Sequence, residues 1–469
     1  VKNRAFALFF IYKNMKKKIY LVLLTIFLSQ IMTTGTELTY KQTLDTAIKN
    51  SFDLKMSELD IGISKAQLKA VRADWYPSLS MQFNTEYNKD LMNGRGTYAY
   101  AGNTMITPYT QFRDMLYMTI SYNLFDFGIQ GKKVHIAKQE IAQKQINYNL
   151  QLRDLKLKVL ELYSKVEQHN NAINTKSEIL SLYKNMFINK ERMYKAGMND
   201  KLSVMDEAVK IAKTQNDIEN SKLELKNALE DLSYYTKNDY EISNLYVHSV
   251  NFEPETEPNI VEVSSKNIIE TEINKIDYNF SFDSYLSDEA KYYDLEIDKK
   301  KSELSILKRQ LLPSFRFYTG YSLYGQNPNN YYSSLQDIGQ RSFVVGISSQ
   351  YVFFDGFKNR ANREKTKLEI EKLQVEKDKK LSELENKYRK SYKAYETYNE
   401  ELDINRQLLS TVKEKLNDVG KLRANKFADQ NQLLSAKADL LNQEYELEQN
   451  IINITSKLEE MKIMSGADL

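Results

Sequence analysis

The sequence predicts a mixed fold in which a membrane β-barrel continues into an α-helical barrel, each built from several copies of the chain. Three observations carry this prediction. Four stretches of strand length alternate between apolar and polar residues. Two very long runs contain no Pro and almost no Gly, which favours long helices. These elements also occur twice in the same order, which indicates an internal duplication.

The composition excludes several classes of protein. The chain of 469 residues has no Cys, which removes disulfides, thiolate metal sites and cysteine nucleophiles. Its three His residues (His135, His169 and His248) are far apart in the sequence, whereas metal sites need clustered donors. A net charge of +3 gives no basis for nucleic-acid binding, and no Gly-rich phosphate loop is present. We therefore expect a protein that is not an enzyme and that carries no cofactor or metal.

Residues 1–36 are predicted to be a signal peptide. Basic residues follow Met15, residues 19–32 are apolar, and small residues near Gly35 allow cleavage. The apolar run of 14 residues is shorter than the ~20 that a membrane-spanning helix needs. Residues 1–14 precede what reads as the natural start, and we interpret them as a misread start site. The mature chain is expected in the periplasm, at the cell surface or in the outer membrane.

Two predicted hairpins, 77–125 and 313–354, each contain a pair of alternating strands. Residues two apart in a strand share a face, so apolar and polar side chains separate to opposite sides. The apolar positions are Leu79, Met81, Phe83 and Tyr87; Leu116, Met118, Ile120, Tyr122 and Leu124; Phe315, Phe317, Tyr321 and Leu323; and Phe343, Val345, Ile347, Tyr351 and Phe353.

Length and residue type favour a membrane location for these strands. Each has about 10–12 residues, as a tilted strand that crosses a bilayer does, and the apolar faces are aromatic toward both ends. Soluble hairpins packed on a core would also alternate, so alternation by itself leaves that alternative open. Four strands cannot close a membrane barrel, and lipid does not tolerate open edges. The chain must therefore associate with copies of itself, and a trimer would give twelve strands.

Each hairpin is followed by a helix of unusual length. We predict long helices over 126–196 and 355–419, each ended by a Gly-containing turn, with return helices over about 199–235 and 421–463. Apolar residues at three- and four-residue spacing give both long helices the pattern of a coiled coil. Such helices are expected to pack side by side as the wall of a tube.

The predicted domain organisation follows the duplication. The first repeat covers 37–235 and the second covers 286–469. Residues 236–285 between them are irregular and polar but keep apolar residues, so we expect a separate small subdomain. Helices over about 39–75 and 286–312 precede the hairpins and would lie end to end with the shorter return helices.

A similar phrase occurs where each second strand becomes a long helix. It reads "LFDFG" around Asp126 and Gly128 and "FFDGF" around Asp355 and Gly356. An Asp at this place can accept hydrogen bonds from the first N–H groups of the helix, and a Gly permits a sharp change of path. We interpret the two Asp residues as helix caps and not as catalytic groups.

In this order and in duplicate, these motifs resemble the TolC-like outer-membrane factors. The similarity covers nearly the whole mature chain, including the opening "LTYKQTLDTAIKNSFDLKMSELDIGISKAQLKAVRADWYPSLS", the two strand exits and the two Gly-bearing turns. It implies a homotrimer with a twelve-stranded barrel in outer-membrane lipid, a helical tunnel in the periplasm and an equatorial subdomain at 236–285. It also implies two partners, a periplasmic adaptor protein and an inner-membrane transporter that supplies energy.

The resemblance further implies functional residues. The adaptor is expected to meet the helix tips, and acidic residues shortly after each tip Gly are expected to narrow the periplasmic aperture. Asp206 and Asp429 each stand nine residues after such a Gly, at positions expected to be equivalent, with Asp200 and Arg423 nearby. The family tends to have Pro where Phe52 stands, so less bending is expected there. The tip residues are Ala196, Gly197 and Met198 in the first repeat and Val419, Gly420 and Lys421 in the second.

The expected function is that of a passive exit duct of a tripartite efflux pump, and other functions stay open. The same family serves type I protein secretion. A trimeric adhesin also builds a barrel from four strands per chain, but it keeps its strands together at the C-terminus, whereas here they are split and internal. A periplasmic enzyme has no supporting residues. We expect an outer-membrane location with the helical part in the periplasm.

Overall fold

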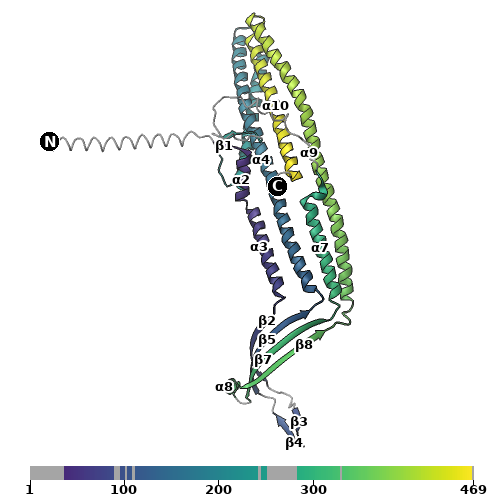
Figure 1. Ribbon diagram of the computed structural model, residues 1–469. Helices are drawn as coiled ribbons and strands as arrows, with labels where there is room; N and C mark the ends of the chain where they lie inside the picture. The colour runs from purple at the N-terminus through teal and green to yellow at the C-terminus, as the bar shows by residue number, and fades with distance from the viewer. Residues whose placement is uncertain are drawn as a thin grey trace, which may run out of the picture. The chain divides into compact units, whose positions relative to one another are not determined.

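The computed structural model describes residues 36–88, 96–100, 103–107, 111–240, 245–250, 282–327 and 330–466 (Figure 1). The predicted signal peptide lies outside these residues apart from Thr36, and so does most of the predicted subdomain at 236–285. The chain forms two compact units. The first contains the chain up to Lys55, Leu150–Ser287 and the chain from Ser382 onward, and the second contains Met56–Asn149 and Asp288–Leu381. Each unit therefore takes residues from both predicted repeats.

Four helices show the duplication directly. The long helices α4 (Ile129–Lys195) and α9 (Lys358–Ala424) have 67 residues each, and the return helices α5 (Lys201–Thr236) and α10 (Gln430–Ser465) have 36 residues each. At 1.5 Å per residue, a helix of this length extends about 100 Å. The predicted pair of long helices with shorter return helices is confirmed. The predicted end of the second long helix at residue 419 is wrong, because α9 continues to Ala424.

The first helix is broken where continuity was expected. Helix α2 (Tyr40–Asn50) and helix α3 (Phe52–Ala73) are separated by Ser51, whose ψ of 123° is extended. The Ser51 hydroxyl accepts a hydrogen bond from the Leu54 N–H at 3.3 Å, so it supplies a partner for the new helix. The Asn50 side-chain amide donates to the Thr236 carbonyl at 2.5 Å, which fixes the break against α5. The predicted single helix over about 39–75 is therefore two helices.

Four antiparallel strands form one sheet in the second unit, as predicted. They are β2 (Ser78–Asn88), β5 (Gln111–Phe125), β7 (Ser314–Asn327) and β8 (Gln340–Gln350), and they lie in the order β2-β5-β7-β8 (Figure 1). The central pair joins the two repeats. The predicted fourth strand was too long, because β8 ends at Gln350 and Tyr351 and Phe353 follow it outside the ladder.

The loops between paired strands contain elements that the sequence did not predict. Strands β3 (Gly96–Tyr100) and β4 (Asn103–Thr107) form a short hairpin between β2 and β5. Helix α8 (Tyr331–Gln336) lies between β7 and β8. Ser334 of α8 donates a hydrogen bond to the buried Asp114 of β5. Helix α8 therefore covers one end of the sheet.

The first unit contains a small parallel sheet and the larger part of the core. Strand β1 (Thr36–Leu38) pairs with β6 (Leu245–Val247). The fully buried Tyr163 places its hydroxyl 2.7 Å from the carbonyl oxygens of both Leu38 and His248. A second cluster in this unit packs α9 against α10 and consists of Leu402, Leu447, Ile454, Leu458 and Met461.

The second unit also contains helix α7 (Asp288–Arg309), preceded in the first unit by a short 3-10 turn at Ser284–Leu286. Among the described residues, none of the helices combines the length and the apolar character that crossing a membrane requires.

Candidate functional site

The sheet has one apolar and one polar face, as predicted. Residues directly opposite each other in neighbouring strands share a face, so the pairing tests the predicted alternation. Apolar residues meet apolar residues across the sheet, as in Leu79 with Ile120, Met118 with Tyr321 and Phe317 with Ile347. Most of this face is open in the single chain: Leu79, Met81, Phe83, Met118, Ile120, Tyr321, Phe343, Val345 and Ile347 are all exposed.

The polar face brings two tyrosines onto two glycines. A Cβ atom on Gly320 would lie 2.6 Å from the hydroxyl of Tyr117, and one on Gly346 would lie 2.7 Å from the hydroxyl of Tyr318. Each aromatic ring thus lies flat over the neighbouring strand, where only Gly leaves room. Most of the remaining positions on this face are Ser, Thr, Asn or Gln, namely Ser80, Gln82, Asn84, Thr119, Ser121, Asn123, Ser342 and Ser348.

The two strand-to-helix junctions share one backbone geometry although their sequences differ. Phe127 and Gly128 have φ values of 54° and 79°, and Gly356 and Phe357 have values of 67° and 66°. Each junction thus contains two successive left-handed residues, of which one is Gly and one is Phe. At Gly128 a Cβ atom would also lie 2.6 Å from the guanidinium of Arg309. Both the left-handed backbone and this close contact therefore disfavour any side chain at position 128.

The Asp residue of each junction accepts hydrogen bonds from the start of the long helix. Asp126 accepts from the N–H groups of Gly128 and Gln130, at 3.0 and 2.8 Å. Asp355 accepts from the N–H of Asn359 at 2.8 Å. Both carboxylates supply partners for otherwise unpaired N–H groups and lie at the positive end of the helix dipole.

Gln130 and Asn359 make a further contact in both junctions. The side-chain amide of Gln130 donates to the Val71 carbonyl in the last turns of α3. That of Asn359 donates to the Leu307 carbonyl in the last turns of α7, at 2.8 Å. Each long helix is thereby joined to the helix that precedes its hairpin. Neither residue was predicted from the sequence, although each stands four positions after a junction Asp.

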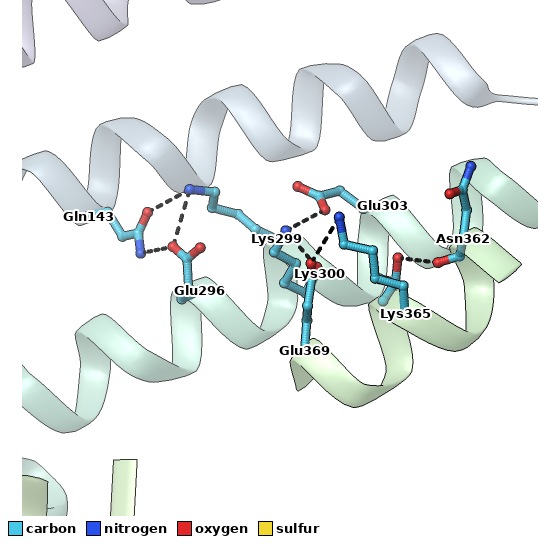
Figure 2. Close-up of polar contacts among 9 residues, drawn as sticks. Gln143, Glu296, Lys299, Lys300, Glu303, Asn362, Lys365 and Glu369 are labelled. Carbon is cyan, nitrogen blue, oxygen red and sulfur yellow. Dashed lines mark hydrogen bonds and ion pairs between the residues drawn. The ribbon is translucent and has the colours of Figure 1, made fainter. Parts of the chain in front are cut away.

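Polar side chains fix α7 between α4 and α9 (Figure 2). Lys299 donates to Gln143 of α4 at 2.8 Å, and it also lies 3.2 Å from Glu296, which the Gln143 amide contacts. On the other side, Lys300 forms ion pairs with Glu303 and with Glu369 of α9. Pairs at such partly exposed positions contribute about 0–1 kcal/mol each, so their main effect is on helix register.

The same helices carry ionised groups with shifted acidities. The hydrogen bond from His135 is the main reason why the pKa of Asp298 lies below its ordinary value. The hydrogen bond from Lys300 likewise lowers the pKa of Glu369. These carboxylates stay charged to lower pH in the folded chain than in the unfolded chain. A layer of charged groups is therefore built into the packing of the second unit.

Both hairpin tips in the first unit have the same turn. Gly197 and Lys426 have left-handed φ values of 72° and 64°. The N–H of the next residue, Met198 or Phe427, donates a hydrogen bond to the carbonyl oxygen of the residue five positions earlier, at an N–O distance of 2.8 Å. This is the hydrogen bond of a Schellman turn. Met198 and Phe427 are 76% and 79% exposed, so each tip presents one large apolar side chain to solvent.

The second tip is not where the sequence predicted it. Val419, Gly420 and Lys421 lie inside α9, and a Cβ atom on Gly420 would meet nothing within 4 Å. The turn instead follows Ala424, and Lys426 occupies the left-handed position that Gly197 occupies in the first tip. Gly marks such turns in sequence because it lacks a Cβ atom. Here a Lys adopts the same left-handed backbone conformation, so the turn could not be recognised from a Gly.

The acidic residues near the tips are exposed, and two of them cap helices. Asp200 accepts from the N–H of Ser203 at 2.6 Å, and Asp429 accepts from that of Gln432 at 2.7 Å. Asp429 is therefore equivalent to Asp200, and the expected equivalence of Asp206 with Asp429 was wrong. Asp206 is exposed one turn into α5. Within the described part of the chain, Arg423 forms no ion pair with these acids.

Two further acids of the first unit, the buried Glu207 and the half-buried Glu167, were not predicted from the sequence. Glu207 is 0% exposed and binds Lys190 at 2.8 Å and Lys210 at 3.1 Å. Glu167 has a buried carboxylate oxygen with no hydrogen-bond partner among the described residues. Burial, with the nearby charge of Glu448, raises the pKa of Glu167 to about 8. A single acidic residue in a helical run gives no sequence signal of burial.

The family of the chain follows from a comparison with family models. The model described as "Outer membrane efflux protein" matches residues 43–236 and 293–459. The two matched segments correspond to the two repeats, and together they cover most of the chain. This chain belongs to the outer membrane efflux protein family. Among curated proteins, no sequence matches this efflux protein significantly.

Solved structures share the fold of this outer membrane efflux protein. The outer membrane protein VceC from Vibrio cholerae superposes with a TM-score of 0.68 at 12% identity, covering 91% of this chain and 96% of the other. The CmeC outer membrane channel of Campylobacter jejuni gives 0.67 at 14% identity, covering 90% and 86%. The MtrE outer membrane channel of Neisseria gonorrhoeae gives 0.62 at 14% identity, covering 91% and 88%.

The family assignment agrees with the architecture of the described residues. This efflux protein is a non-enzymatic outer-membrane duct, with a four-stranded amphipathic sheet and long helices. The predicted family, fold class and outer-membrane location are confirmed.

Proposed function

We propose that this protein is the exit duct of a tripartite efflux pump and works as a homotrimer. The observation that carries the proposal is the sheet, which exposes an apolar face. Among the described residues, its edge strands β2 and β8 each pair on one side only. Lipid accepts the apolar face but does not accept open edges. Because the strands alternate in direction, β8 of one copy can pair antiparallel with β2 of the next. Three copies would supply the twelve strands of a closed barrel.

Exposed apolar stripes on the helices support the same assembly. Side chains three, four or seven positions apart lie along one helix face. Such stripes occur in both units, and large apolar residues at these spacings are normally covered by another helix. A neighbouring copy of the chain would cover them. The residues are Met56, Leu59 and Ile63 in α3, Leu368 and Val375 in α9, and Leu202, Met205 and Val209 in α5.

Contact with a periplasmic adaptor is proposed for the two helix tips. Met198 and Phe427 occupy equivalent positions and are the most exposed apolar residues of the two turns. Exposed apolar anchors surrounded by polar residues are typical of protein–protein contacts. In the second repeat, the residues proposed to contact the adaptor are therefore Lys426 and Phe427, in place of Val419, Gly420 and Lys421. The exposed Asp200, Asp206, Asp429 and Arg423 remain the candidates for a periplasmic aperture.

The duct is proposed to be passive, with the energy supplied by an inner-membrane transporter. The sequence contains no Gly-rich phosphate loop, and no cluster of metal-binding side chains occurs among the described residues.

Two adjacent valines of β8 offer a matched test of the membrane-facing side. Val345 lies on the apolar face and is 58% exposed, whereas Val344 lies on the polar face and is 43% exposed. A Lys on the lipid face of a membrane strand costs about 2–4 kcal/mol near the midplane. We expect V345K to reduce trimers in the outer-membrane fraction strongly and V344K to leave them near the wild-type level. Equal levels for the two variants, or a wild-type protein that is monomeric and soluble without detergent, would overturn the proposal.

The cargo is tested in a strain that lacks the protein. If the protein is an efflux duct, the strain without it should be more sensitive to drugs and detergents. The wild-type protein and V344K should restore resistance, and V345K should not. Loss of secreted proteins without a change in drug sensitivity would favour type I secretion instead.

A further inference from the structure

The polar face of the sheet carries very little charge. In the rows of paired residues nearest the helices, Asn123 pairs with Arg316, which in turn pairs with Ser348. In the next row Ser121 pairs with Tyr318, and Tyr318 with Gly346. The following rows contain only Ser, Thr, Tyr, Gln, Gly and Val until Met115 and the Glu86–Arg113 pair at the far end. Glu86 and Arg113 neutralise each other at 3.2 Å.

Arg316 is thus the one charged residue on the described polar face without an oppositely charged neighbour. Its side chain is exposed, and none of the described residues forms an ion pair with it. The carboxylates of the two strand-to-helix junctions, Asp126 and Asp355, both accept hydrogen bonds from helix N–H groups. The β5–β7 ladder shifts register between Asn123 and Phe125, directly beside Arg316. Such a bulge can change the direction of nearby side chains.

We infer that Arg316 is a selectivity-determining residue that gives the channel a ring of positive charge in its lumen, at the helix end of the barrel. The inference rests on the proposed function, because it requires the polar face to line a closed, water-filled barrel. Three copies of the chain would place three guanidinium groups at one level of the lumen. Rings of Arg or Lys favour anions in pores. Anionic solutes are therefore the cargo class that this part of the duct admits best.

Ion selectivity of the purified protein in a planar lipid bilayer tests this inference. The reversal potential in a KCl gradient gives the ratio of chloride to potassium permeability. Arg316→Gln removes the charge, and we expect it to lower this ratio by about threefold. Because the lumen potential acts in opposite directions on the two ions, this corresponds to a change of about half a kT in that potential. Arg316→Glu should lower the ratio further. Arg316→Lys keeps the charge and should keep the wild-type ratio.

Arg341 provides the matched control. It pairs with Leu323 and so lies on the apolar face, at the other end of the strand. Arg341→Gln removes the same charge from outside the lumen and should leave the ratio unchanged. The inference is overturned if Arg316→Gln and Arg316→Glu form conducting channels with the wild-type ratio, or if Arg341→Gln changes it equally. A wild-type trimer that conducts no ions would instead reject the channel itself, and the inference with it.

Discussion

Gly197 and Lys426 occupy the same position in two helical hairpins, 229 residues apart, and both adopt a left-handed backbone. The turns around them have the same hydrogen bonds, and each is followed three residues later by an Asp that caps the return helix. The geometry of the tip is therefore duplicated even where its sequence is not. Gly420, which the sequence favours as the second tip, lies inside a helix.

Substitution of Gly197 should therefore destabilise the protein, whereas substitutions of Lys426 and Gly420 should stabilise it. G197A forces a Cβ atom into the left-handed region and should lower the free energy of unfolding by about 1 kcal/mol. K426G relieves that strain and should raise it by about 0.5–1 kcal/mol, and G420A should raise it similarly, since Ala is the better helix former. Chemical unfolding of the purified protein in detergent measures the three changes. A G420A variant as destabilised as G197A would show that the turn is at Gly420 after all.

The junction amides should matter about equally in the two repeats. Q130L and N359L each remove a donor and leave the carbonyl of Val71 or Leu307 without its partner. We expect each variant to lose about 1–3 kcal/mol of unfolding free energy. Q145L, at an exposed position of α4, serves as the control and should have little effect. If Q130L and Q145L unfold at the same denaturant concentration, the junction contact is not stabilising.

The packing of Tyr117 on Gly320 predicts a coupled pair of residues. G320A places a methyl group 2.6 Å from the Tyr117 hydroxyl, so the ring must move, and stability should fall by about 1–3 kcal/mol. In a Y117S background the ring is gone, and the same substitution should cost much less. G131A is the control, because nothing lies within 4 Å of its new methyl group. A double-mutant cycle of unfolding free energies measures the coupling, and simple additivity would argue against the contact.

Glu167 predicts a stability that decreases as the pH rises. Its pKa is about 8 in the folded chain, above the ordinary value of 4.5, so the folded state holds a proton that the unfolded state releases between these values. Stability from this group is complete below about pH 4.5 and is lost by about pH 8. E167Q should thus exceed the wild type by up to about 4 kcal/mol at pH 8.5 and match it near pH 4.5.

Unfolding curves of E167Q and of the control E178Q at both pH values measure this difference. Glu178 is exposed in the same helix, so its variant should follow the wild type at both values. An E167Q advantage that does not change with pH would exclude a buried proton as its cause.

Residue periodicity predicted most of the fold because local physics decides it. Strand alternation separates an apolar from a polar face whatever the strand pairs with, so the assignments around Met81, Met118 and Ile347 were confirmed by the register. The absence of Pro from the long runs likewise permitted the 67-residue helices. Signals carried by a single residue were less reliable. Gly420 suggested a turn that Lys426 makes, and the helical pattern over 39–75 gave no sign of the break at Ser51.

The sequence by itself determined the family, the two faces of the sheet, the duplication and the junction Asp residues, because each of these is written in a local pattern of residue types. Only the tertiary structure decided which side chains meet across hundreds of residues. The contact of Asn50 with Thr236, the pairing of Arg316 with two neutral residues and the burial of one Glu167 carboxylate oxygen depend on how separate elements pack. Packing is set by the summed contacts of many residues, so no short segment of the sequence encodes it.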